Sequence, residues 1–402
     1  MPKYTISKKA DGVVERDLSV IKKIIVERLN PISIILFGGF GRGEGSFEII
    51  NGKPNPLNDY DLYVITKKKI PDKVLEETGM ECSRALGKGG KEFAENPFSI
   101  YDKGEFFHVD IRCIKYSELG RLRRINRTYE LKYGSTAIYG EDVRRKIRID
   151  SLPVSEAFRY LINPACQLLL CMDSRRLDGN FRKDEETFAL HHIIKTYLAC
   201  ASSLLISSGK FAPTYRKTNS EVKRIYGKKF PELVKRIDEA TRFKVMPRHK
   251  KIRDLKKRWF QARDDLAFVL AYISSKHLNI KTKNNDIKQL TTDIYKKLPY
   301  SYFTPYLPFG PLSRFAFPAQ YALNILYFKI TGYFRALFGW RDIGLRIEMA
   351  SFLLLFALDN KSLVDDAYNY IKTFYPAKSK KWEDLREALL YSFDRYFSQK
   401  LI

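Results

Sequence analysis

Two aspartates one residue apart, close behind a glycine-rich turn, are the side chains of this sequence whose spacing most clearly suggests chemistry. The segment ILFGGFGRGEGSFEIINGKPNPLNDYDLYVI spans residues 35–65 and places Asp59 and Asp61 at the start of an apolar run. Side chains two positions apart on a strand lie on the same face, so we expect the two carboxylates to point the same way. Paired carboxylates are ligands that Mg²⁺ shares with the phosphates of a substrate.

The glycine turn offers a place for those phosphates. Four glycines follow the apolar run 32–37 within a few positions: Gly38, Gly39, Gly41 and Gly43. Glycine lets the backbone turn sharply and aim several N–H groups at one point, and such a nest binds phosphate oxygens. Arg42 adds a cation to the same turn. We therefore predict a phosphate-binding turn, with Gly38, Gly39 and Arg42 as nucleotide-binding residues.

A third carboxylate stands in the next strand-like segment. GEFFHVDIRCI, residues 104–114, alternates in polarity and carries Asp110. On a strand beside Asp59 and Asp61, Asp110 would complete a site for two Mg²⁺ ions. One ion would hold the triphosphate of an NTP. The other would lower the pKa of an acceptor hydroxyl and orient it for in-line attack on the α-phosphorus.

These motifs, GGFGRGE, then NDYDLYVI, then VDI, resemble the polymerase-β-type nucleotidyltransferase superfamily over residues 20–115. The resemblance is nearest to the minimal and aminoglycoside-type nucleotidyltransferases. It implies that Gly38 and Gly39 contact the β- and γ-phosphates and that Asp59 and Asp61 bind the metals. It also implies that Asp110 binds the catalytic metal or acts as base.

The sequence departs from the family pattern at two places and extends it at a third. Gly39 stands where the family usually has serine, so a hydroxyl contact to phosphate is missing. The loop Glu44–Asn58 is several residues longer than in the minimal enzymes, and we expect an excursion over the site. In this superfamily a helix after the sheet domain often supplies a lysine to the triphosphate. Lys195, in the helical pattern 184–197, is our candidate for that lysine.

The pattern of periodicities predicts an α+β protein. A helix over 17–29, strands over 32–37, 61–65 and 104–114, and a helix over 71–86 would form an N-terminal nucleotidyltransferase-type mixed sheet with flanking helices. After residue 151 the apolar spacing is helical almost throughout, so an all-helical C-terminal region follows. We expect a catalytic domain at 1–150, a helical acceptor- or nucleotide-closing domain at 151–280 and a further helical region at 281–402.

Charge bears on the partners of the protein. The formal charge is +26, and residues 1–150 hold 28 Lys+Arg and 22 Asp+Glu out of totals of 72 and 46. Most of the positive charge therefore lies after residue 150. A basic helical region could bind nucleic acid, although solvated helix faces explain the same charge equally well.

The cysteines and the hydropathy of the sequence indicate the cell compartment in which we expect the protein. The five cysteines are scattered without a CxxC pair, which argues against a disulfide framework and against zinc. No apolar run approaches the roughly 20 residues that a membrane-spanning helix needs, and the N-terminus lacks the apolar core of a signal peptide. We therefore expect a cytoplasmic protein without a transmembrane segment.

The sequence thus favours a Mg²⁺-dependent nucleotidyltransferase that uses ATP or another NTP and releases pyrophosphate. It would transfer a nucleoside monophosphate to an acceptor hydroxyl or phosphate on a small molecule, an RNA end or a protein, and these three acceptor classes remain open. One alternative is a catalytically silent nucleotide- or RNA-binding module on the same fold. Another is a membrane-surface scaffold that uses the aromatic and basic C-terminal half.

Overall fold

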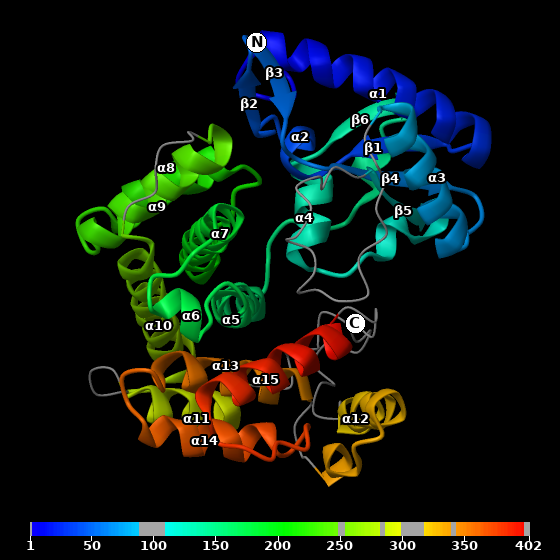
Figure 1. Ribbon diagram of the computed structural model, residues 1–402. Coiled ribbons are helices and arrows are strands. Elements are labelled where there is room, and N and C mark those ends of the chain that lie inside the picture. Colours follow the sequence, from blue (N-terminus) through cyan, green and yellow to red (C-terminus); the bar gives the residue numbers. More distant parts are fainter. Residues whose placement is uncertain are drawn as a thin grey trace. The chain divides into compact units, whose positions relative to one another are not determined.

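The computed structural model describes residues 2–87, 109–247, 254–281, 286–298, 317–338 and 343–397 (Figure 1). Two compact units are present. The first comprises Met1–Leu152 with Gly209–Lys251, and the second comprises Pro153–Ser208 with Ile252–Ile402. The three domains expected from the sequence stay a prediction, although residues Gly209–Lys251 group here with the N-terminal unit.

A small mixed sheet forms the centre of the first unit. Its strands are β1 (Ser33–Leu36), β4 (Tyr60–Thr66), β5 (Val109–Lys115) and β6 (Thr136–Gly140), in the order β5-β4-β1-β6. β4 and β5 are parallel, and β1 is antiparallel to both β4 and β6. The α+β prediction is therefore confirmed. Residues 104–108 of the third predicted strand lie outside the described residues.

The edge strand β6 is a feature that the sequence analysis missed. The pairing of β1 with β6 shifts register between Ile34 and Ile35, because Ile34 pairs with Tyr139 and Ile35 with Ala137. A five-residue strand with a bulge carries no clean alternation, so its sequence looks like a turn. Only pairing with β1 makes it a strand.

Each face of the sheet is covered by a different layer. α1 (Lys8–Leu29) and α3 (Asp72–Ala85) contribute to the core on one face, where Leu62 and Val64 of β4 are buried. Tyr63 and Ile65 point to the opposite face and pack against the second layer. That layer consists of η2 (Tyr116–Arg121), α4 (Asn126–Tyr133) and η3 (Val143–Lys146). Figure 1 shows α1 and α4 on opposite sides of the strands.

The long loop between the glycine turn and the aspartates is a β-hairpin. β2 (Phe47–Ile50) and β3 (Lys53–Pro56) pair antiparallel, and Asn51 and Gly52 at the tip have φ values of 50° and 75°. Such Asn-Gly tips suit two-residue hairpin turns. At the base, Asn58 Oδ1 accepts a hydrogen bond from the Ser46 N–H at 2.6 Å.

Two further helices belong to the first unit, α8 (Tyr215–Tyr226) and α9 (Pro231–Val245). Thr214 caps α8 by accepting from the Lys217 N–H at 3.2 Å, and Pro231 opens α9 at the first helical position.

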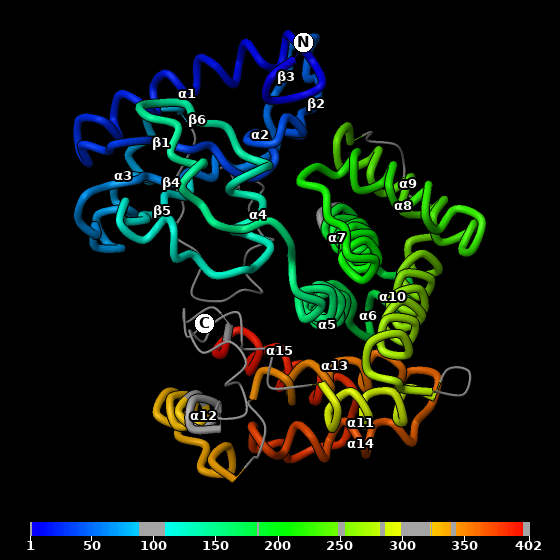
Figure 2. The backbone as a smooth tube through the Cα atoms, turned by 180° about the vertical axis from the view of Figure 1, so that it is seen from behind, coloured from blue at the N-terminus to red at the C-terminus, as the bar shows by residue number. Residues whose placement is uncertain are grey.

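The second unit is helical throughout its described residues, which confirms the helical C-terminal region. Its α-helices are α5 (Val154–Leu170), α6 (Ser174–Leu177), α7 (Lys183–Ser207), α10 (Leu255–Leu278), α11 (Ile287–Lys297), α12 (Phe317–Thr331), α13 (Ile343–Phe356), α14 (Ser362–Ile371) and α15 (Trp382–Phe397). A short 3-10 helix, η6 (Phe334–Phe338), follows α12. Figure 2 shows α11, α13, α14 and α15 gathered into one group.

α7 is largely buried in this unit, where it packs against α5 and α10. Its segment Glu185–Ser207 is long and apolar enough to cross a membrane, but 89% of the most apolar stretch is buried inside the structure. Within the described part of the chain it is the one segment with that length and composition.

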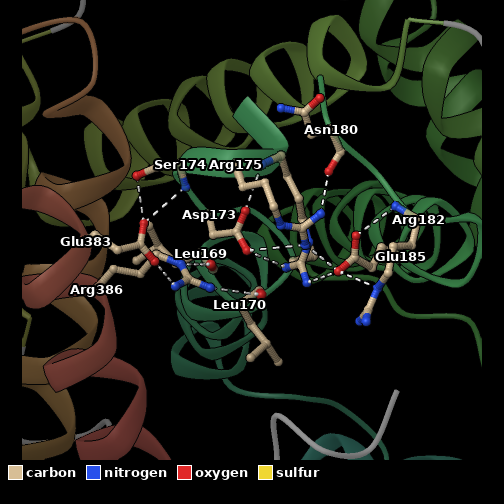
Figure 3. A network of polar contacts seen from close by, with 12 residues as sticks. Leu169, Leu170, Asp173, Ser174, Arg175, Asn180, Arg182, Glu185, Glu383 and Arg386 are labelled. Carbon is tan, nitrogen blue, oxygen red and sulfur yellow. Dashed lines mark hydrogen bonds and ion pairs between the residues drawn. The ribbon is translucent and has the colours of Figure 1, made fainter. Parts of the chain in front are cut away.

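An arginine-rich network fixes the start of α7 (Figure 3). The Glu185 side chain is only 1% exposed and accepts hydrogen bonds from Arg175 at 2.5 Å and Arg176 at 3.0 Å. The backbone N–H of Arg182 donates to its other oxygen at 2.8 Å. Burial raises the pKa of Glu185, but these hydrogen bonds outweigh it and lower the pKa to about 2. Glu185 is therefore a buried, ionised anchor of the unit.

The C-terminal helix α15 joins the same network. Arg386 donates to the carbonyl oxygen of Leu169 at 2.8 Å, close to the end of α5. Glu383 accepts from both the N–H and the hydroxyl of Ser174 at the start of α6, at 3.1 and 2.9 Å. Two charges from α15 thus satisfy backbone groups at the ends of two other helices.

Candidate functional site

Asp61 and Asp110 lie directly beside each other in the sheet. They are register partners on the parallel strands β4 and β5, and each is the second residue of its strand. Strand alternation places both on the face that carries Tyr63, toward the η2–α4–η3 layer. The structure thus brings together two of the three aspartates singled out from the sequence.

The glycine turn contacts this carboxylate pair directly. Gly38 opens the four-residue helix α2 (Gly38–Gly41) with a φ of 66°, and a Cβ added there would lie 2.1 Å from Asp61 Oδ2. The Phe37 N–H donates to the backbone oxygen of Asp61 at 2.8 Å. A glycine is needed at position 38 both for the left-handed backbone and for the approach of the carboxylate.

Gly39 lies next to Asn58 at the base of the hairpin, and Asp59 is the residue that follows Asn58. A Cβ on Gly39 would lie 3.1 Å from Asn58 Oδ1, so the position where the family usually has serine faces the base of the hairpin. Asp59 is partly buried and immediately precedes β4. The glycine turn therefore contacts the start of β4 through Gly38 and the residues just before it through Gly39.

Arg42 has protein partners inside the turn. Its Nε donates to the Gly38 carbonyl oxygen at 2.9 Å, and its Nη1 pairs with Glu130 at 3.2 Å. The guanidinium also lies over the ring of Tyr215, 4.7 Å from its centre, and the side chain is only 9% exposed. These contacts show that Arg42 stabilises the turn. Its contact with a phosphate stays a prediction.

Glu44 is a residue of this region that the sequence analysis did not single out. Its carboxylate is fully buried and accepts from the N–H groups of Tyr215 and Arg216, at 2.5 and 2.9 Å, and from Arg216 Nε at 3.1 Å. A carboxylate at a helix N-terminus satisfies N–H groups that have no partner within the helix. Glu44 therefore joins the end of the glycine turn to α8.

Nearby contacts reinforce this junction. The hydroxyl of Ser46 donates to the carbonyl oxygen of Lys244 near the end of α9. Burial raises the pKa of Tyr215, whose ring lies against Arg42. The only sequence signal for the junction was the glutamate of the GRGEGS segment, because its partners lie some 170 residues away.

Arg112, which the sequence analysis did not single out, contacts the carboxylate pair directly. Arg112 donates to Asp110 Oδ2 from Nε at 3.0 Å and from Nη2 at 2.8 Å. Burial raises the pKa of Tyr63, while the charges of Arg127 and Arg112 act in the opposite direction. Arg127 is an exposed residue of α4. Arg112 is placed to balance the negative charge of Asp110.

The donor set fits a magnesium ion shared with a substrate better than a preformed metal cage. Among the described residues, no group of three or more His, Cys, Asp or Glu side chains is close enough together to hold a metal. Asp61 and Asp110 are nevertheless neighbours on one face, and Mg²⁺ commonly uses one or two carboxylates with phosphate oxygens and waters. The two-metal site that includes Asp59 stays a prediction.

Lys195 belongs to the second unit, where it is an exposed residue of α7. Next to it on the helix, His191 is exposed and His192 is buried. Burial, with a smaller effect from Lys195, lowers the pKa of His192 to about 3. The role of Lys195 with a triphosphate stays a prediction.

Comparison with known proteins adds little to this geometry. No protein-family model and no curated protein sequence matches the chain. One solved structure with some similarity is the spectinomycin adenyltransferase AAD(9) from Enterococcus faecialis, crystallised with ATP and spectinomycin. It is 15% identical, with a TM-score of 0.37, and the match covers 63% of this chain and 99% of that one. The functional argument therefore rests on the site itself.

Proposed function

We propose that this protein is a nucleotidyltransferase that moves a nucleoside monophosphate from an NTP to an acceptor hydroxyl or phosphate. The observation that carries the proposal is the contact between Gly38 and Asp61, with Asp110 beside Asp61 on the parallel strand. A phosphate nest and two carboxylates on one face supply the two things that this reaction needs. These are a place for the triphosphate and oxygen ligands at the reacting phosphorus.

The protein residues have distinct roles in this proposal. Backbone N–H groups of the turn at Gly38 and Gly39 bind the β- and γ-phosphates. Asp61 and Asp110 hold Mg²⁺, with Asp59 as a further ligand, and Mg²⁺ when bound neutralises phosphate charge and acidifies the acceptor hydroxyl. Lys195 is proposed as a further partner of the triphosphate. The acceptor can be a small molecule, an RNA end or a protein, as the sequence analysis left open.

The proposed transfer step exchanges one bond at the α-phosphorus for another. The acceptor oxygen forms a bond to the α-phosphorus, and the bond from that phosphorus to the oxygen bridging to the β-phosphate breaks. Pyrophosphate leaves with the electron pair, and the hydroxyl proton passes to a carboxylate, for which we propose Asp110. Arg112 hydrogen-bonds to Asp110 through Oδ2, so a metal or a proton bound at that oxygen would displace these hydrogen bonds.

A catalytically silent nucleotide-binding module is the second candidate, and one observation favours it. Asp110 Oδ2 already accepts two hydrogen bonds from Arg112. Two hydrogen bonds from a cation occupy that oxygen, so it is less available to a metal ion. Such a protein would bind an NTP at the glycine turn without turning it over.

Label transfer separates the two candidates. The protein is incubated with Mg²⁺, each of the four α-labelled NTPs and cell extract divided into RNA, protein and small-molecule fractions. Asp61→Asn is the test variant. Asp178→Asn, a change at an exposed residue in the second unit, is the matched control.

Label that appears in one fraction, survives in Asp178→Asn and disappears in Asp61→Asn supports the nucleotidyltransferase and names its acceptor class. NTP binding without label in any fraction supports the silent module. If neither binding nor transfer occurs, both candidates are wrong.

A further inference from the structure

We propose that the layer formed by η2, α4 and η3 is a binding surface for single-stranded nucleic acid. In the proposed reaction, this surface would bring the end of the strand to Asp61 and Asp110 as the acceptor. The role of the nucleic acid as acceptor rests on the proposed function, whereas its binding to this surface does not.

The cations of this layer face outward because the apolar residues between them are anchored inside. In the segment RLRR, Leu122 packs against the core of this face, and Arg121 and Arg123 are exposed. In the segment RRKIRI, Ile147 and Ile149 are 1% and 2% exposed. The exposed cations of that segment are Arg145, Lys146 and Arg148.

The cations of η2 and η3 form one surface and not two separate runs. Lys146 lies over the ring of Tyr116, 5.0 Å from its centre. A Cβ on Gly120 would lie 3.8 Å from Arg148 Nε. The two segments are more than 20 residues apart in sequence, so only the fold places their side chains next to each other.

The surface belongs to the layer that packs on the same face of the sheet as the carboxylate pair. The η2–α4–η3 layer covers the face of the sheet to which Asp61 and Asp110 belong. Arg127 and Arg112 both act electrostatically on Tyr63, as do the two aspartates themselves. The acceptor role requires a strand bound along the layer to extend to these two carboxylates.

The charge exceeds what a nucleotide alone requires. Residues 121–148 contain seven arginines and two lysines but only three carboxylates. Two of those carboxylates already have partners, because Glu130 pairs with Arg42 and Asp142 with Arg144. Among the described residues, no carboxylate forms an ion pair with Arg121, Arg124, Arg127, Arg145 or Arg148. An NTP carries about four negative charges, whereas a nucleic-acid strand adds one with every nucleotide.

The side-chain types also favour nucleic acid. Arginine binds phosphate oxygens through two parallel hydrogen bonds, which lysine cannot do. Tyr133 at the end of α4 is 45% exposed, and an exposed aromatic ring can stack with an unpaired base. The charge of the whole chain pointed instead to the region after residue 150. The inference therefore places nucleic acid on a different part of the molecule.

Binding of a labelled single-stranded RNA of about 20 nucleotides tests the proposal by fluorescence anisotropy over a salt series. The test variant is Arg121→Ala/Arg145→Ala/Arg148→Ala. The matched control is Lys8→Ala/Arg16→Ala/Lys23→Ala, which removes the same charge from exposed positions of α1 on the opposite face of the sheet. Thermal melts of both variants should match the wild type, because all six side chains are exposed.

We expect the test variant to lose at least about tenfold in affinity and its slope of log K against log salt to fall by about two. The control should bind as the wild type does. Equal loss in both variants, or no RNA binding at all, would overturn the proposal. Binding to phosphatidylserine vesicles with the same arginine dependence, in place of RNA binding, would also overturn it and assign the surface to a membrane.

Asp61→Asn separates this inference from the proposed function. That variant should bind RNA normally, because it leaves the basic surface intact. RNA binding without transfer to RNA would contradict the acceptor role while leaving the binding surface supported. Transfer to a small molecule without RNA binding would contradict only the surface.

Discussion

Asp61 Oδ2 lies only 2.1 Å from the point where a Cβ on residue 38 would stand, so the carboxylate of β4 packs directly against the glycine turn. This contact makes the turn and the strand a single site. It also makes the geometry of the carboxylate sensitive to the smallest change in the turn.

Gly38→Ala should therefore displace Asp61. The backbone at position 38 has a φ of 66°, and the new methyl group would collide with the carboxylate. Gly52→Ala is the matched control, because Gly52 has a φ of 75° with open space around it. Both changes carry the cost of a left-handed alanine, about 1–2 kcal/mol. Only Gly38→Ala should also abolish NTP binding measured by calorimetry, and equal NTP affinities in the two variants would contradict the assignment.

Asp61→Asn and Asp110→Asn should each remove at least about 10³-fold of the transfer rate, because the proposed metal chemistry depends on both charges. The fold should persist, since both side chains are only partly buried at the edge of the core. Single-turnover kinetics with an α-labelled NTP measure the rate, and circular dichroism checks the fold. Near-normal turnover in either variant would refute the assigned role of that carboxylate.

Arg112→Ala tests whether Asp110 is held back by its partner. Removal of the guanidinium frees Asp110 Oδ2 from two hydrogen bonds. If the arginine restrains the carboxylate, Mg²⁺ affinity should rise by several-fold, while if it orients the carboxylate, affinity and turnover should both fall. Titration of metal-dependent NTP binding distinguishes these results. An unchanged affinity would show that the pair is irrelevant to metal binding.

Glu44→Gln should loosen α8 from the glycine turn. Glutamine keeps one acceptor oxygen but presents an NH₂ group to the remaining donors, so a buried N–H loses its partner at a cost of about 1–3 kcal/mol. Hydrogen exchange at the Tyr215 and Arg216 amides should become faster. Glu48→Gln, on the neighbouring hairpin, is the control and should leave these amides protected. Unchanged exchange in Glu44→Gln would mean that the carboxylate contributes little to the junction.

Glu185 should make the second unit sensitive to acid. Its pKa is about 2 in the folded protein, below the ordinary value of 4.5. A carboxyl with a depressed folded-state pKa stabilises the protein above its unfolded pKa, and this contribution is lost as the pH falls from about 4.5 toward 2. The contribution amounts to at most about 3 kcal/mol. Urea unfolding of Glu185→Gln should therefore show a deficit at pH 7 that shrinks by pH 3, and a deficit independent of pH would contradict this account.

The sequence alone determined the local parts of the site. The apolar runs, the glycine cluster and the spacing of Asp59 and Asp61 are features of neighbouring residues, and strand alternation follows from backbone geometry. Position 110 could be placed on a strand for the same reason. The mixed sheet and the helical region after residue 150 followed from periodicity over windows of ten to twenty residues.

The tertiary structure decided which distant residues meet. Glu44 contacts Tyr215, and Arg42 contacts Glu130, across 171 and 88 positions of sequence. Such pairs are selected by packing and by the cost of burying a charge without a partner, and neither leaves a local pattern. For the same reason β6 exists only through its pairing with β1. The cations around Tyr116 and Gly120 become one surface only when η2 and η3 pack on the same face of the sheet.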